Sequence, residues 1–259
     1  VYYLWRLGVW SPTLAAGTTR SHIPGVREYL AVLLDPNIGL VAWMPALAVL
    51  TVLGAAALLL TRARRPADLD LKLTTLCCAV SGPTFMYGMT QALNVNSGGT
   101  ERVSRYTMWL IPLALPFLEA AVMGVERRRP LLITALAVAL VAPYLVYFNP
   151  ARSYAYLWPT RQAALLYEYA PGWYLPLPEI FWERQMGRDT WALQDPGSAA
   201  TAQCTLILLS KRDPNQPCPL TPEEAEQAQR MFHGGWRSVW IVRQGPLDLG
   251  RAGVFGEAR

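Results

Sequence analysis

The sequence predicts a mainly α-helical membrane protein, with about four transmembrane helices followed by a small α+β extracytoplasmic domain. Three observations support this fold class. The 24 residues of the range 37–60 carry no charge, and the basic sequence Thr-Arg-Ala-Arg-Arg follows them directly. Of the 259 residues, 53% are hydrophobic. Most of the apolar sequence lies in 37–150, whereas 151–259 has the composition of a water-exposed domain.

Hydropathy places the predicted transmembrane helices at 37–60, 73–95, 105–125 and 130–148. A helix of 24 residues is roughly 36 Å long, which is enough to cross the hydrocarbon core of a bilayer. Prolines inside the second and third ranges fit this assignment, because neighbouring helices can satisfy the carbonyls that a proline leaves unbonded. The predicted domains are an extracytoplasmic loop segment (1–36), a four-helix transmembrane domain (37–150) and a periplasmic α+β domain (151–259).

Basic residues set the predicted orientation. The loops after the first and third ranges carry most of the arginine near the apolar segments, which by the positive-inside rule places both loops in the cytoplasm. Residues 1–36 and 151–259 are then outside, and the chain belongs in the bacterial inner membrane as a multi-pass protein with a periplasmic C-terminal domain. The net charge of +5 is explained by these loops, so it does not indicate a nucleic-acid partner. The bilayer itself is the first predicted partner. The basic residues counted are Arg62, Arg64, Arg65, Lys72, Arg127, Arg128 and Arg129.

The C-terminal region has the pattern of a small α+β module. A strand is expected at 203–209 and a second strand at 238–243. Between them, Thr221 precedes Pro222, and Glu224 stands three residues after the threonine. This spacing is typical of a capping box with proline in the first helical position, and it predicts a helix over 222–232.

The cysteines divide into two pairs. Cys204 and Cys218 lie in the predicted periplasmic domain, where a disulfide would close a loop of about 15 residues and stabilise the domain by about 3 kcal/mol. Two independent thiols are the alternative. Cys77 and Cys78 are neighbours on a predicted helix, and packing is the default role for both. No histidine has cysteine or carboxylate partners at ligand spacing, and no cofactor motif is present, so neither a metal nor a cofactor is predicted.

The most informative polar sequence lies at 94–106, between the second and third apolar ranges. Arg105 and Arg102 are candidates for binding a phosphate or diphosphate, because a guanidinium holds such a group with two parallel hydrogen bonds. Tyr106 is a candidate for packing on a sugar or a lipid, and Asn96 for a further polar contact. Plainer interpretations stay open: Arg102 pairs with the adjacent Glu101, and Arg105 extends to lipid headgroups.

Two carboxylates complete the candidate polar site. Asp35 precedes Pro36 before the first apolar range, and capping a helix is the simpler role for it than catalysis. Glu119 falls inside the third range, where an ionisable group is a functional candidate by default. Its position near Arg127 leaves open that it faces the inner interface. No general base can be assigned from the sequence.

Three stretches together resemble the C-terminal half of bacterial GT-C membrane glycosyltransferases, the mannosyltransferase-like enzymes that use polyprenyl-phosphate sugars. Tyr3-Leu4-Trp5-Arg6-Leu7-Gly8-Val9-Trp10-Ser11-Pro12 is similar to an outer-loop segment of this family. Leu33 to Leu40 with Trp43-Met44-Pro45 is similar to the start of one of its helices. Gly98-Gly99 with Ser104-Arg105-Tyr106 and Ile111-Pro112-Leu113 is similar to one of its turns. The resemblance covers roughly residues 1–125.

The resemblance implies hexosyl transfer from a polyprenyl-phosphate-linked sugar at the outer face of the inner membrane, with Arg105 contacting the lipid phosphate. The family's catalytic aspartate lies in the first outer loop of the full protein. The catalytic base is therefore expected outside this chain, which would be a fragment of a longer protein. The alternative is a non-catalytic accessory or structural subunit of a larger membrane complex, whose helices pack against other membrane subunits.

Overall fold

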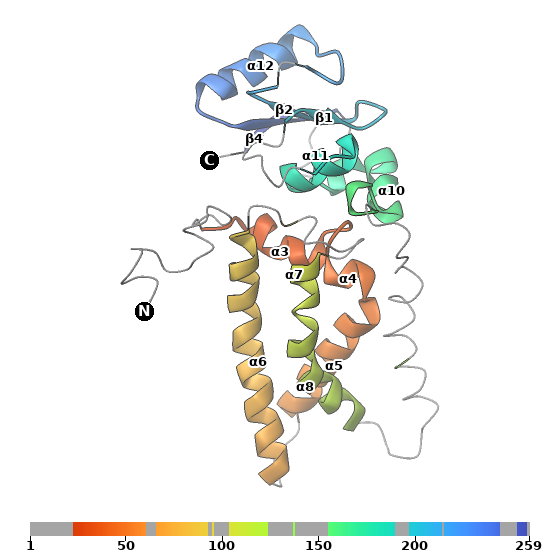
Figure 1. Cartoon of the computed structure of the whole chain (residues 1–259), viewed down its shortest axis with the longest axis vertical. Helices are drawn as coiled ribbons and strands as arrows, with labels where there is room; N and C mark the ends of the chain where they lie inside the picture. The colour runs from red at the N-terminus through yellow and green to blue at the C-terminus, as the bar shows by residue number, and fades with distance from the viewer. Residues whose placement is uncertain are drawn as a thin grey trace. The chain divides into compact units, whose positions relative to one another are not determined.

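The computed structural model describes residues 23–60, 66–92, 95, 104–123, 137, 155–189, 197–213, 215–243 and 253–257. The chain divides into two compact units, Val1–Ser153 and Tyr154–Arg259, which we call unit 1 and unit 2 and describe separately (Figure 1).

Unit 1 is helical, and its helix boundaries follow local sequence signals. Proline occupies the first position of two helices, where its missing N–H costs nothing. The structure has α3 (Val26–Leu34), α4 (Leu40–Trp43), α5 (Pro45–Leu60), α6 (Pro66–Thr90), α7 (Arg105–Met108) and α8 (Ile111–Met123).

Helix α8 packs against both α5 and α6, and the three run side by side in Figure 1. The backbones of α5 and α8 approach each other at Gly54, where a Cβ atom would collide with the carbonyl oxygen of Phe117. The absence of a side chain at this position therefore allows the two backbones to meet. At the other end of unit 1, α3 contacts α4, α6 and α7, and the hydroxyl of Tyr29 donates a hydrogen bond to the Pro83 carbonyl oxygen at 3.0 Å.

The predicted transmembrane helices are contradicted. Within the described residues, every helix falls short of the length or the apolar composition that crossing a membrane requires. The range 37–60 is broken at Met44, which leaves α5 with 16 residues where about 20 are needed. Helix α6 has 25 residues, but it contains three charges near its start and several Ser, Thr and Gly residues after them. Helix α8 has 13 residues, and the fourth range, 130–148, lies outside the described residues.

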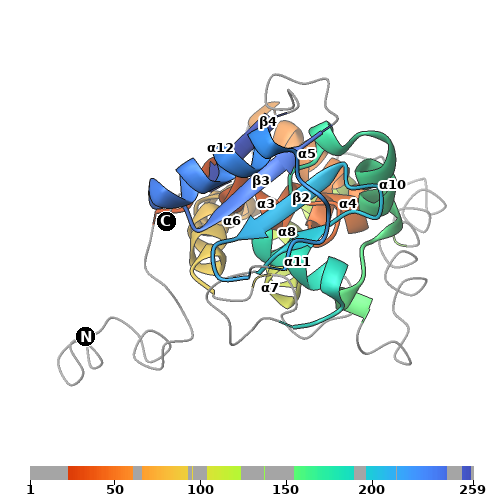
Figure 2. The ribbon, with the colours of Figure 1, turned by 90° about the horizontal axis from the view of Figure 1, so that it is seen from above.

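Unit 2 is built on a four-stranded antiparallel sheet in the order β1-β2-β3-β4, as far as its residues are described. The strands are β1 (Ala199–Ala200), β2 (Leu206–Ser210), β3 (Ser238–Val242) and β4 (Gly253–Glu257). The helical elements are η1 (Ala155–Leu157), α10 (Arg161–Tyr169), η2 (Pro171–Trp173), α11 (Pro178–Met186) and α12 (Pro222–His233). Figures 1 and 2 show α12 over one face of the sheet and α10 and α11 towards the other.

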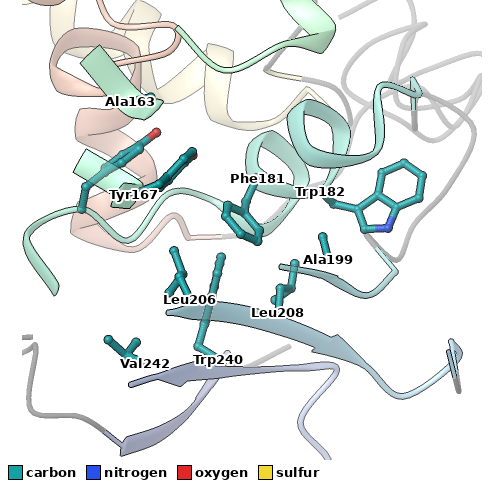
Figure 3. Close-up of a cluster of buried hydrophobic side chains, with 10 residues drawn as sticks. Ala163, Tyr167, Phe181, Trp182, Ala199, Leu206, Leu208, Trp240 and Val242 are labelled. Carbon is teal, nitrogen blue, oxygen red and sulfur yellow. The ribbon is translucent and has the colours of Figure 1, made fainter. Parts of the chain in front are cut away.

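Both faces of the sheet are therefore covered, which explains the unbroken apolar sequences of its central strands. Successive side chains of a strand point to opposite faces. In β2, Leu206 and Leu208 join the cluster beneath α10 and α11, whereas Ile207 and Leu209 join the cluster beneath α12. The register pairs Leu208 with Trp240 of β3, and the Phe181 ring lies 5.0 Å from the Trp240 ring between centroids (Figure 3).

The predicted elements of this region are present with shifted ends. The helix expected at 222–232 is α12, which ends one residue later, and its capping box is confirmed: Thr221 Oγ1 accepts from the Glu224 N–H, and Glu224 Oε2 accepts from the Thr221 N–H. The strand expected at 203–209 begins later, at Leu206, because the preceding residues form a turn in which Thr201 Oγ1 accepts two backbone N–H groups.

An ion pair fastens the start of α12 to the end of β3. Arg243 donates from Nε to Glu224 Oε1 at 3.0 Å and from Nη2 to Oε2 at 2.9 Å, and Nη2 also donates to the Pro219 carbonyl oxygen. The hydrogen bonds from Arg243 lower the pKa of the Glu224 carboxyl below its usual value. Both side chains are largely shielded, with exposed fractions of 17% for Glu224 and 28% for Arg243.

We expect this pair to make the stability of unit 2 depend on pH. A carboxyl with a lower pKa in the folded state stabilises fully above its unfolded pKa of about 4.3, and the contribution is lost as the pH falls through the folded pKa. Glu224→Gln should therefore lower the free energy of unfolding by about 1 kcal/mol at pH 7 and much less at pH 3, as measured by melts at both pH values.

The matched control is Glu226→Gln on the same helix. Glu226 lies 4.0 Å from Arg230, and both side chains are 70% exposed, so its loss should change stability by a few tenths of a kcal/mol at most. Equal losses for the two variants at pH 7 would contradict the assignment.

Candidate functional site

The first part of the candidate site is the turn that joins α3 to α4. Asp35 ends α3, and its Oδ1 accepts hydrogen bonds from the backbone N–H groups of Asn37 at 2.7 Å and Ile38 at 3.3 Å. The Asn37 carbonyl oxygen in turn accepts from the indole Nε1 of Trp43 at 3.0 Å. Asp35, Asn37 and Ile38 are buried, so the carboxylate of Asp35 serves to hold the chain reversal.

Gly39 closes this turn because nothing larger fits. Its N–H donates to the Asp35 carbonyl oxygen at 2.7 Å, and a Cβ on Gly39 would lie 2.6 Å from the same oxygen. The structure therefore gives Asp35 a structural role in the turn, but not as the cap of the following helix that the sequence suggested, because Gly39 is the N-cap of α4.

The second part is the start of α7. Ser104 is its N-cap and is fully buried; its Oγ accepts from the N–H of Tyr106 at 3.3 Å. Arg105 is the first residue of the helix, and its side chain lies outside the described residues. The half-buried ring of Tyr106 meets Trp109 edge-on at 5.5 Å between centroids, and Trp109 lies 5.8 Å from the Phe85 ring of α6.

These two parts belong to the same end of unit 1, since α3 packs against both α4 and α7 (Figure 1). Segments that are almost 70 residues apart in the sequence, around Asp35 and around Ser104, thus lie on neighbouring elements. Thr107 in α7 adds a feature that sequence reasoning missed. It is fully buried, and its hydroxyl has no hydrogen-bond partner within the described part of the chain.

The remaining candidates are not brought into this arrangement. Glu119 is exposed on α8, so the argument from a buried ionisable group does not apply to it. Arg102 and Asn96 fall outside the described residues. No group of three or more histidine, cysteine, aspartate or glutamate side chains gathers closely enough to hold a metal ion in the described ranges.

A pair of buried charges in unit 2 was also missed. Glu183 and Arg184 lie on α11 among apolar neighbours, and both are almost completely shielded from solvent. The Arg184 guanidinium donates from Nη1 to the carbonyl oxygen of Trp158 at 2.7 Å, which ties η1 and its following residues to α11. The only signal in the sequence is that the Glu-Arg pair directly follows Ile180-Phe181-Trp182, and charged residues are rarely buried without partners.

The disulfide between Cys204 and Cys218 is confirmed, with 6.0 Å between the two Cα atoms. Cys204 has a φ of 53°, a left-handed conformation that is unusual for a residue with a side chain, and its N–H donates to the Thr201 carbonyl oxygen. Cys77 and Cys78 are free thiols on α6.

No protein-family model matches the chain, and neither the curated proteins nor the solved structures contain a match.

Proposed function

We propose that this chain is part of a glycosyltransferase that takes a sugar from a polyprenyl phosphate at the outer face of the bacterial inner membrane. The observation that carries the proposal is the packing of α3 on α7. It places the Asp35–Gly39 turn and the Ser104–Arg105–Tyr106 helix start, the two described stretches that resemble the family, on neighbouring elements of one unit.

In this proposal Arg105 binds the lipid phosphate. The buried Ser104 cap holds the backbone at the start of α7, where Arg105 is the first residue. A guanidinium suits a phosphate because its N–H groups form parallel hydrogen bonds to two oxygens. Tyr106, Trp109 and Phe85 supply adjacent aromatic surface for the sugar or for the first isoprene units. We assign Asp35 to the turn, because the residue is buried and its Oδ1 accepts two backbone N–H groups, and we expect the base elsewhere in the enzyme.

The disulfide of unit 2 supports the periplasmic location in this proposal. Disulfides persist in oxidising compartments and are rare in the cytosol. A periplasmic unit 2 accounts for the Cys204–Cys218 bond, and it agrees with a reaction on the same side of the membrane.

The test is phosphate-dependent capture of a photoreactive polyprenyl phosphate by the full chain. A hydrogen bond to a charged group contributes about 1.5–3 kcal/mol, so Arg105→Ala should weaken capture by about tenfold or more. Arg105→Lys should restore part of it, because the charge remains but the paired hydrogen bonds are lost. Polyprenol without phosphate should not compete, whereas unlabelled polyprenyl phosphate should.

Arg230→Ala is the control, since Arg230 is an exposed arginine on α12 of unit 2 and is not among the proposed lipid contacts. Capture by Arg105→Ala equal to that by the wild type, or full competition by polyprenol, would overturn the assignment of Arg105 as the phosphate contact.

A second candidate function is that of a non-catalytic subunit whose helices pack against other membrane subunits. The observation in its favour is the large apolar surface of α5 and α6, which the described residues leave uncovered. Purification of the full chain from its own bacterium with a mild detergent separates the two candidates. Constant co-purification with the same membrane subunits, without capture of polyprenyl phosphate, supports the second. The exposed apolar side chains are Val49, Val52, Leu53, Leu59 and Leu60 of α5 and Leu69, Leu73, Leu76 and Val80 of α6.

A further inference from the structure

Among the unit 2 residues whose side chains the structure describes, the exposed large apolar ones all precede Gly197 in the chain. They belong to the elements that precede the sheet, and three of them are aromatic: Trp158 is 62% exposed, Tyr169 74% and Trp173 64%. Leu165 of α10 and Met186 of α11 are exposed as well. We call these five residues the aromatic rim. Between Gly197 and Arg243, where the structure describes the side chains, no large apolar side chain is exposed.

The backbone that carries the rim is held firmly by the core. On α10, Ala163 and Tyr167 are buried, whereas Leu165 and Tyr169, one turn apart, face outwards. The stacked rings of Tyr167 and Tyr174, 5.3 Å apart, fasten η2 and therefore Trp173. These outward positions are fixed features of the fold, because the opposite face of the same elements builds the core cluster seen in Figure 3.

The composition of the rim fits the headgroup layer of a bilayer. Trp and Tyr join an apolar ring to a polar N–H or O–H, and they favour the boundary between hydrocarbon and water. Arg161 lies one turn before Leu165 on the same side of α10, and Arg188 is exposed just after α11. Both supply positive charge for anionic headgroups. Of the nearby acids, Asp189 accepts a hydrogen bond from the Tyr156 hydroxyl at 3.0 Å, and Glu168 interacts with the phenol of Tyr169.

We propose that the aromatic rim of unit 2 rests in the headgroup layer of an anionic phospholipid bilayer. The proposal does not depend on sugar transfer, because it rests on residues of unit 2 alone.

The experiment uses the full chain with Cys77→Ser and Cys78→Ser, so that the only native cysteines left are the two in the disulfide. A spin label is placed at Tyr169→Cys in the rim or at Glu226→Cys on the exposed side of α12. Vesicles of phosphatidylcholine with phosphatidylglycerol are added. The label at 169 should gain collisions with oxygen and lose collisions with a water-soluble nickel complex, at a depth no greater than roughly 5–10 Å, whereas the label at 226 should not change.

Substitutions at other positions show which side chains cause the change in accessibility at the label. Trp158→Ser with Trp173→Ser should reduce the change at the label. Arg161→Gln should remove the advantage of phosphatidylglycerol over phosphatidylcholine alone, and Arg230→Gln on α12 should leave it intact. Two results would overturn the proposal: equal water accessibility at 169 and 226 in the presence of vesicles, or a label at 169 that becomes immobile with rising protein concentration in their absence, which would assign the rim to a second copy of the chain.

Discussion

Trp240→Ala is expected to lower the free energy of unfolding of unit 2 by about 3–5 kcal/mol, because it removes a large buried side chain from the centre of the sheet. Trp240 is 1% exposed and belongs to the cluster that α10, α11, β2 and β3 share. Its ring contacts Phe181, which contacts Tyr167 in turn at 5.4 Å between centroids. The cavity would therefore open where helices and sheet meet, and neighbouring side chains held by several elements can fill it only in part.

Native-state hydrogen exchange of the β2 and β3 amides reports this loss without interference from unit 1. A loss of 3–5 kcal/mol should speed exchange of the slowest amides by about a hundredfold to several thousandfold, since each 1.4 kcal/mol is a factor of ten. The control is Trp173→Ala, the same chemical change at a side chain that is 64% exposed, for which about 0.5 kcal/mol or less is expected. Similar acceleration by both variants would show that Trp240 does not anchor the core.

Trp240→Phe refines the expectation. The indole Nε1 of Trp240 is buried and has no hydrogen-bond partner in the described part of the structure. Phenylalanine keeps most of the apolar volume and removes this unsatisfied donor, whose burial is itself unfavourable. The loss should therefore be clearly smaller than for alanine.

Unit 2 shows which parts of this fold the sequence predicts well. The Thr221–Glu224 capping box has one local meaning, and α12 begins where it indicates. The apolar sequence of β3 is likewise a local signal, and the strand occupies Ser238–Val242. What the sequence does not reveal is that both faces of the sheet are covered, because that depends on α10 and α11, whose cluster with the sheet is assembled from distant segments.

Unit 1 shows why a hydropathy argument fails when it ignores the turns within an apolar range. The range 37–60 contains no charge, yet Asp35 organises a tight turn over its first residues and the helix restarts at Pro45. Both signals were present in the sequence, as Asp-Pro-Asn and Met-Pro. An average over the range gives them little weight, although each of them ends or begins a helix.

The sequence identifies the two stretches of the candidate site, but it does not reveal that they lie on neighbouring elements. The sequence singles out Asp35 as a residue at a chain boundary, although it ends α3 instead of capping the next helix, and the role of Ser104 as the N-cap of α7 was not predicted. The contact of α3 with α7 and the unpartnered hydroxyl of Thr107 arise only from tertiary packing. Glu119 is exposed on α8, and the argument for it depended on a transmembrane helix that the described residues do not form.

Loss of the disulfide is the second large effect expected. Cys204 and Cys218 are separated by 14 positions, and closing a loop of this size is expected to stabilise unit 2 by about 3 kcal/mol. Cys218 is buried in the cluster beneath α12, and Cys204 packs against the same cluster. Cys218→Ser should therefore lower the melting temperature of unit 2 and accelerate amide exchange in α12 and β3, whereas Cys77→Ser, which removes a free exposed thiol, should do neither.

The conformation of Cys204 separates the effect of the bond from the effect of the backbone. With a φ of 53°, any residue with a side chain is strained there by roughly 1–2 kcal/mol, whereas glycine is not. Cys204→Ser and Cys204→Gly both break the disulfide, but the glycine variant should be the more stable of the two by melting temperature. If the serine variant is equally stable, the left-handed backbone does not persist once the bond is gone. In that case the disulfide imposes the turn as well as closing the loop.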